Sequence, residues 1–154
     1  MMDLILWRHA EAIDLEEGGN DMDRFLTPKG ERQAARMSTW LDRVLPQGTR
    51  IFCSPATRCE QTVMALGRRY KLREELSPNG HPDEVLSLAQ WPVSKSAVLV
   101  VGHQPYLGQV VAKLFDMKVG ECSIKKASVW WFKSKQKNNE THTNLHAVQN
   151  ADLI

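Results

Sequence analysis

The sequence has little of what marks disulfide-rich, membrane-spanning or nucleic-acid-binding proteins. Its three cysteines, Cys53, Cys59 and Cys122, are odd in number and lack CxxC spacing. This excludes a disulfide framework or zinc site as the expected architecture and favours the reducing cytoplasm. No run approaches the roughly 18 consecutive apolar residues that cross a bilayer. Twenty lysines and arginines against 18 aspartates and glutamates leave a formal charge of +2, which is too small to indicate a nucleic-acid partner.

What is present is the composition of an ordinary globular protein. Hydrophobic residues make up 42% of the chain and charged residues 25%, both close to the averages for such proteins. The length of 154 residues predicts a single domain over residues 1–154. The apolar run at Asp3–Trp7 follows no basic segment, so we expect a buried strand there and not a signal peptide.

Short apolar runs alternate with amphipathic segments along the chain. Residues 3–7, 51–53 and 97–101 predict strands, and a weaker strand is expected near 72–75. Helices are predicted over 28–45, directly after Ser54-Pro55, over 83–91 and over 105–114. Residues 14–24 are expected to form an exposed loop. Segments 127–132 and 144–148 predict a hairpin across a polar loop at 133–140. The alternation predicts a three-layer α/β fold: a mainly parallel sheet, helices on both faces and antiparallel edge strands.

Three of the predicted strand ends carry arginine or histidine. Arg8 and His9 follow the first strand, Arg58 lies shortly after the second, and His103 follows the strand at 97–101. Ligands of such sheets bind at the carboxyl ends of the strands, where these residues should converge. Arginine offers a planar fork of donors that matches phosphate. Arg58 would also lie in the first turn of a helix, where a bound anion would offset the unfavourable dipole.

Each of these residues also has a purely structural interpretation. Arg58 could extend into solvent, and a histidine at a strand end is more often a hydrogen-bonded structural residue than a catalytic one. The joint occurrence at three strand ends is what favours an oxyanion site. Cys53 does not provide a phosphatase loop of the tyrosine-phosphatase type, because Cys53 and Arg58 are separated by four residues and not by five.

Four segments resemble the motifs of the histidine phosphatase superfamily, which includes the phosphoglycerate mutases. They are LWRHAE at 6–11, LTPKGERQA at 26–34, SPATRCEQT at 54–62 and VGH at 101–103. They occur in the family's order over about residues 4–103. Within the superfamily, the short chain and the segment ELSP at 75–78 are most similar to the SixA-type phosphohistidine phosphatases.

The resemblance implies roles for individual residues. His9 would be the nucleophile that forms a phosphohistidine intermediate, and Arg8, Arg58 and His103 would hold the phosphoryl oxygens. Ser54 would lie beside the phosphate. Glu75 occupies the position of the family's proton donor. Asp21 and Asp14, in the loop after His9, are alternatives for that role. No metal or other cofactor is expected, because the cationic side chains supply the charge.

The spacing between motifs bears on the substrate. Only about twenty residues separate Glu75 from the strand at Ala97, which leaves little chain for the lid that larger relatives place over small metabolites. A shallow site favours phosphohistidine on a signalling or phosphotransfer protein as the substrate. The alternatives are a phosphatase of a small phosphometabolite, such as a sugar or nucleotide phosphate, and a phosphate-binding module without turnover. Neither a nucleic-acid nor a membrane partner is expected.

Overall fold

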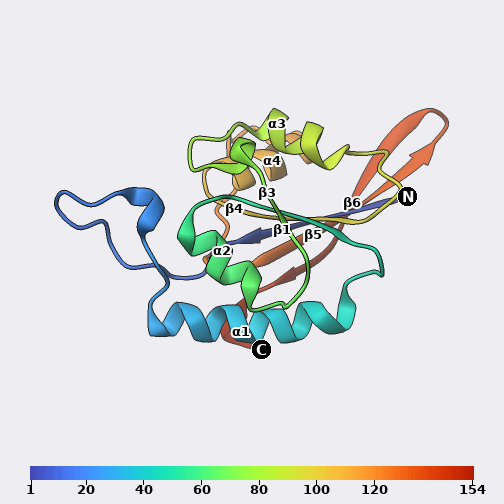
Figure 1. The fold of residues 1–154 in the computed structure, drawn as a ribbon. Coiled ribbons are helices and arrows are strands. Elements are labelled where there is room, and N and C mark those ends of the chain that lie inside the picture. Colours follow the sequence, from blue (N-terminus) through green and yellow to red (C-terminus); the bar gives the residue numbers. More distant parts are fainter.

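The fold is built on one six-stranded sheet. The computed structural model describes residues 1–154, and the strands lie in the order β3-β2-β4-β1-β5-β6 (Figure 1). The strands are β1 (Met2–Arg8), β2 (Arg50–Cys53), β3 (Lys71–Leu72), β4 (Val98–Gly102), β5 (Val129–Lys137) and β6 (Glu140–Gln149). The first four are parallel to one another, whereas β5 runs antiparallel to β1 and β6 to β5. This confirms the predicted fold class.

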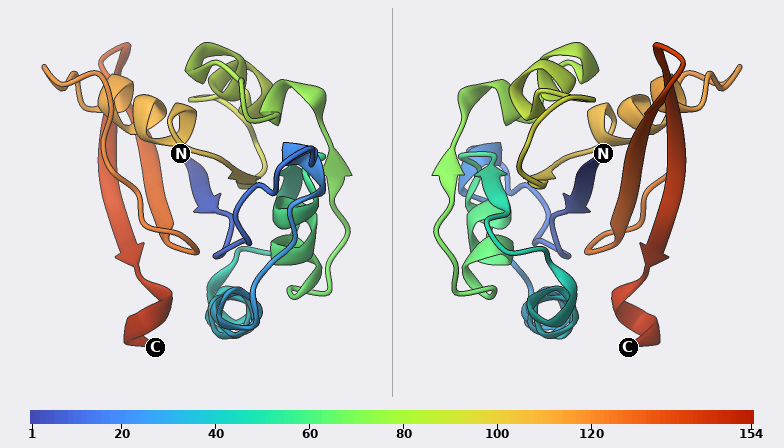
Figure 2. Two further views of the ribbon diagram at one scale, coloured as in Figure 1. Left: turned by 90° about the vertical axis from the view of Figure 1, so that its left-hand side faces the viewer. Right: turned by 90° about the vertical axis from the view of Figure 1, so that its right-hand side faces the viewer.

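Helices cover both faces of the sheet. Figures 1 and 2 show α1 and α2 on one face and α3 and α4 on the other. Alternate residues of β1 enter different hydrophobic clusters: Ile5 and Trp7 pack toward α1 and α2, whereas Leu4 and Leu6 pack toward α3 and α4. A strand that is buried on both faces needs a continuous apolar run, which explains the N-terminal sequence. The helices are α1 (Pro28–Val44), α2 (Thr57–Met64), α3 (Pro82–Ala89) and α4 (Tyr106–Leu114), with short 3-10 turns η1 (Asp21–Asp23), η2 (Glu74–Leu76) and η3 (Ala151–Leu153).

The starts of the first two helices differ in how well the sequence predicted them. Helix α1 begins as expected: Pro28 occupies its first turn, and the Thr27 hydroxyl accepts a hydrogen bond from the Gly30 N–H. Helix α2 does not begin directly after Ser54. It begins at Thr57, and its N-cap, Ala56, has no side chain that could cap it. The Ser54 hydroxyl instead contacts a histidine ring, as described below.

The C-terminal hairpin is longer than the sequence suggested. The predicted polar loop at 133–140 is wrong, because β5 continues to Lys137 and β6 begins at Glu140. The turn consists of Asn138 and Asn139, with φ of 54° and 62°. Asparagine tolerates this left-handed region and supports tight hairpin turns. The strand ends are polar because they extend beyond the hydrophobic core, so their composition resembled that of a loop (Figure 1).

At the opposite edge, β3 is very short. It pairs only with Phe52 and Cys53 of β2. The predicted strand at 72–75 is therefore only partly present, since residues 74–76 form η2. The loop predicted at 14–24 contains η1. No helix in the structure is both long enough and apolar enough to span a membrane.

Candidate active site

The carboxyl ends of β1, β2 and β4 form one site. His9 follows β1, Ser54 follows β2 and His103 follows β4. Backbone hydrogen bonds extend the sheet into the site, from the His9 N–H to the Gly102 carbonyl at 3.1 Å and from the Ser54 N–H to the Val101 carbonyl at 3.0 Å. The rings of His9 and His103 lie with centroids 5.2 Å apart. The parallel topology thus brings together side chains that are up to 94 residues apart in sequence.

His9 is held as a neutral imidazole with one free nitrogen. Its Nδ1 donates to the Ala10 carbonyl at 2.8 Å, which leaves Nε2 as the unprotonated nitrogen. The side chain is buried, and the residue is 7% exposed. Burial lowers the pKa of His9 to about 3, and the charges of Arg58 and Arg8 act in the same direction. The ring is therefore nucleophilic throughout the physiological pH range.

His103 is fixed by contacts on both ring nitrogens. Its Nε2 lies 2.8 Å from the Ser54 Oγ and 3.3 Å from the Cys59 Sγ. Its Nδ1 lies 3.4 Å from Nη2 of Arg58. Because Arg58 is always a donor, the Nε2–H tautomer is the one that fits both contacts. Burial lowers the pKa of His103 to about 2, with His9 and Arg58 as further causes. Ser54 is fully buried and contacts the site through this ring.

Two arginines line the site with unpaired donors. Nη1 of Arg58 donates to the Asp21 carbonyl at 2.8 Å, and Nη2 contacts the Asp21 carboxylate at 3.1 Å. Nη1 of Arg8 donates to the Ile124 carbonyl at 2.7 Å. The Nε atoms of both arginines are buried without a hydrogen-bond partner. Buried orphan donors are rare in proteins, so each guanidinium holds hydrogen-bonding capacity and positive charge beside the two histidines that no protein group uses fully.

The three candidate proton donors lie in different places. Asp21 is brought to the site by its contact with Arg58. Partial burial alone would raise the pKa of Asp21, but hydrogen bonds from Arg24 and Arg58 outweigh it and lower the pKa overall. Asp14 is exposed in a hollow of the 13–25 loop and has no contact with His9, His103 or either site arginine among the hydrogen bonds and ion pairs of the structure.

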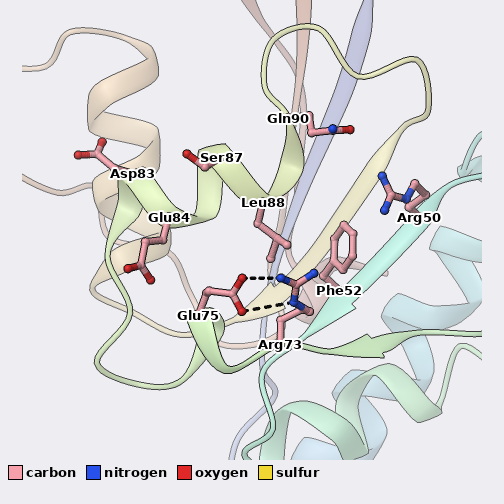
Figure 3. Close-up of a pocket in the computed structure, with 9 residues that line it drawn as sticks. All are labelled: Arg50, Phe52, Arg73, Glu75, Asp83, Glu84, Ser87, Leu88 and Gln90. Carbon is pink, nitrogen blue, oxygen red and sulfur yellow. Dashed lines mark hydrogen bonds and ion pairs between the residues drawn. The ribbon is translucent and has the colours of Figure 1, made fainter.

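Glu75 lines a cavity to which neither histidine contributes. Its carboxylate pairs with Arg73, at 2.6 Å from Nη2, in a cavity of about 640 Å³ that His9 does not line (Figure 3). The hydrogen bond from Arg73 lowers the pKa of Glu75. Both Asp21 and Glu75 are therefore ionised at neutral pH in this state.

Comparisons with known proteins agree with this geometry. The family description "Histidine phosphatase superfamily (branch 1)" matches residues 4–79. The phosphohistidine phosphatase SixA of Escherichia coli is 30% identical over 121 residues, which are 73% of this chain and 74% of that protein. The chain belongs to the histidine phosphatase superfamily. Its fold is shared with a SixA structure complexed with tungstate (TM-score 0.76, 21% identity, 99% of both chains). It is also shared with phosphoserine phosphatase of Entamoeba histolytica (TM-score 0.73, 15% identity, 98% of both chains).

In this histidine phosphatase, the polar residues of the motifs hold the loop that follows His9. Oε1 of Gln33 accepts from the Glu11 N–H at 3.0 Å, and Oε1 of Gln61 accepts from the Leu26 N–H at 2.7 Å. The Thr62 hydroxyl accepts from the Ala10 N–H at 3.0 Å and donates to the Arg58 carbonyl at 2.7 Å. Thr62 thus connects the loop that follows His9 to the helix that carries Arg58.

These supporting residues are absent from the candidates that the sequence provided. A signal for them exists, because Gln33 and Thr62 lie on the apolar faces of α1 and α2 and are buried. A polar side chain at such a position must find a hydrogen-bond partner. Gly30 has a related role, since a Cβ at this position would collide with the Glu11 carbonyl. Helix α1 can therefore approach the active-site loop only with glycine there.

Proposed function

We propose that this histidine phosphatase removes the phosphoryl group from phosphohistidine on a protein, with His9 as the covalent nucleophile. The observation that carries the proposal is the state of His9. The ring is buried and neutral, its Nδ1 is engaged by Ala10, and it lies beside two arginines whose Nε donors are unpaired. Such a site provides a nucleophile and fixed positive charge, which are what phosphoryl transfer requires.

The reaction proceeds in two displacements. Nε2 of His9 attacks phosphorus, the bond from phosphorus to the substrate's imidazole nitrogen breaks, and its electron pair leaves with that nitrogen. Water then attacks phosphorus and forms a P–O bond, and the bond to Nε2 of His9 breaks with its electron pair returning to that nitrogen. Inorganic phosphate is released, and one proton of the water passes to solvent. Arg8, Arg58 and His103 bind the phosphoryl oxygens, and Ser54 contributes by orienting His103. Donors fixed in this way contribute about 2.7–4 kcal/mol each to transition-state stabilisation in comparable oxyanion sites.

The ionisation of the carboxyl groups supports phosphohistidine over an alkyl phosphate. Asp21 and Glu75 have lowered pKa values, so neither holds a proton for the leaving group at neutral pH. An imidazole with an ordinary pKa near 6.5 can leave as a neutral ring when its other nitrogen is protonated. An alkoxide cannot leave so easily. A dedicated acid is therefore dispensable for this substrate, whereas an alkyl phosphate would need Glu75 or Asp21 in that role.

The E. coli relative, named phosphohistidine phosphatase SixA, supports the same substrate class. We place the reaction in the cytoplasm, with no cofactor and with a phosphorylated protein as partner. The test is phosphate release from a phosphohistidine-carrying protein domain, compared at equal concentration with a panel of phosphometabolites, with His9→Ala as the blank. A preference of a hundredfold or more in kcat/KM, about 2.7 kcal/mol, is expected. Turnover no faster than that of His9→Ala would refute the proposal.

A second candidate is a phosphatase of a small phosphometabolite. The observation that favours it is the shared fold with a phosphoserine phosphatase (TM-score 0.73). Faster turnover of one metabolite in the same panel would select this alternative and keep His9 as the nucleophile. Absence of turnover on every substrate would instead favour a phosphate-binding module.

A further inference from the structure

A groove with four cations and no carboxylate lies at the β3 edge of the sheet. It has a volume of about 570 Å³ and is formed by the start of β2 and the segment that leads into β3. Four of its eight lining residues are Arg50, Arg68, Arg69 and Lys71, and none is acidic. Of these cations only Arg68 has an ionic partner, Asp42 at 3.0 Å. Arg50, Arg69 and Lys71 are exposed and take part in none of the ion pairs of the structure.

The groove has a defined wall and an open edge. The Arg50 guanidinium lies over the Phe52 ring, 5.1 Å from its centroid, and is thereby held at the rim. Because β3 pairs only with Phe52 and Cys53, the residues Arg50 and Ile51 have no strand on that side. An extended segment of another protein can therefore approach this part of the sheet edge. Beyond Arg50 lies the larger cavity of Figure 3, where Glu75, Asp83 and Glu84 are acidic. These carboxylates repel an acidic partner, which can therefore bind only in the groove on the side of Arg50 that is nearer to α2.

The groove is connected to the active site through β2. Arg50 lines the groove at the start of β2, and Ser54, four residues further along the chain, contacts His103. At the rise of a strand this separation along β2 is roughly 13 Å. A sugar phosphate bound at His9 would not span it, but a protein substrate would.

We propose that this groove docks an acidic segment of the phosphoprotein substrate beside its phosphohistidine. The inference rests on the proposed function and deepens it, because it names a feature by which the protein substrate is recognised. Complementary exposed charges raise association rates by about 10 to 10³ and are screened by salt. We therefore expect the groove to raise kcat/KM for acidic substrates at low ionic strength.

The test uses two phosphohistidine peptides that differ only in a tail of four glutamates or four serines. A flexible spacer of about six residues separates the tail from the phosphohistidine, which is enough to cover the gap of roughly 13 Å. The variant is Arg50→Gln/Arg69→Gln/Lys71→Gln. The matched control, Arg36→Gln/Lys135→Gln/Lys137→Gln, removes the same charge from exposed positions on α1 and the hairpin. N-phosphorylimidazole reports the activity of the catalytic site alone.

The wild type and the control should prefer the glutamate peptide about tenfold at low ionic strength, and the preference should disappear at about 0.5 M salt. The groove variant should lose the preference and hydrolyse N-phosphorylimidazole at the wild-type rate. Equal kcat/KM of the wild type for the two peptides, or an equal loss in the control, would overturn the proposal.

A binding experiment separates this proposal from the proposed function. The unphosphorylated glutamate peptide, labelled for fluorescence anisotropy, should bind the wild type more tightly than the groove variant. If phosphohistidine is not hydrolysed but this difference is seen, the proposed function fails and the groove remains an acidic docking surface. If the label is displaced by oligouridylate at lower concentrations than by the glutamate peptide, the surface is a nucleic-acid site and the docking proposal fails.

Discussion

The two buried histidines should make the protein sensitive to mild acid. In the folded state the pKa of His9 is lowered to about 3 and that of His103 to about 2, whereas both are near 6.5 in the unfolded chain. A lowered histidine pKa means that the unfolded chain binds protons that the folded protein does not bind. The stability present above pH 6.5 is therefore lost as the pH falls toward 3. Between pH 7 and pH 5 each histidine removes about 1.9 kcal/mol, and the two together remove about 4 kcal/mol.

This loss can be isolated with a variant that has no proton to bind at either position. The free energy of unfolding of the wild type minus that of His9→Asn/His103→Asn should be about 4 kcal/mol lower at pH 5 than at pH 7. The other titrating groups are common to both proteins, so their contribution cancels in this difference. Urea unfolding at the two pH values, followed by tryptophan fluorescence, gives the free energies. Each single variant should recover about half of the effect. An identical pH dependence in the wild type and the double variant would refute the assignment of neutral, buried rings.

Three further predictions concern other parts of the site. Arg58→Lys keeps the charge but loses the planar fork that reaches Asp21 with two nitrogens. The kcat/KM should therefore fall about 10²–10³-fold while the circular dichroism spectrum stays unchanged. Thr62→Val leaves the buried Ala10 N–H without its acceptor. This should lower the free energy of unfolding, measured by urea titration, by about 1–3 kcal/mol. The control is Thr39→Val, on the exposed side of α1. Glu75→Gln and Asp21→Asn should each change kcat on phosphohistidine less than tenfold, because both carboxyl groups are already ionised. A hundredfold loss of kcat in either variant, with a shifted basic limb of its pH profile, would contradict this and identify that residue as the proton donor.

The parts of the fold that could be predicted from sequence are those in which local pattern and burial agree. The first strand is an example, because Leu4, Ile5, Leu6 and Trp7 must all be apolar to be buried on both faces. The hairpin is the opposite case. Beyond Ser134, the strand β5 has an exposed polar end, and its identity depends on pairing with β6, which no local pattern of hydrophobicity reports. The Asn138-Asn139 turn was the available signal for a tight connection.

The candidate site shows the same division. The convergence of His9, Ser54, Arg58 and His103 follows from strand ends in a parallel sheet, a topological rule that needs only the order of the elements. The position of Glu75 depends on the direction of one side chain after a two-residue strand, and its pairing with Arg73 decides that direction. Neither composition nor spacing contains this information. For Thr62 the sequence signals only that a polar group on an apolar helix face needs a partner. Which two backbone groups it contacts depends on the folded chain.

The electrostatics of the site connect stability to catalysis. Burial that keeps His9 and His103 neutral also leaves the Nε donors of Arg8 and Arg58 without partners, so the free enzyme holds positive charge that nothing in the site fully neutralises. Asp21 offsets part of it through Arg58. A bound oxyanion would offset the charge of both guanidiniums and add a negative charge that raises the pKa of either histidine. Phosphate or vanadate should therefore stabilise the fold most at acidic pH, where protonation of the two rings otherwise favours the unfolded chain.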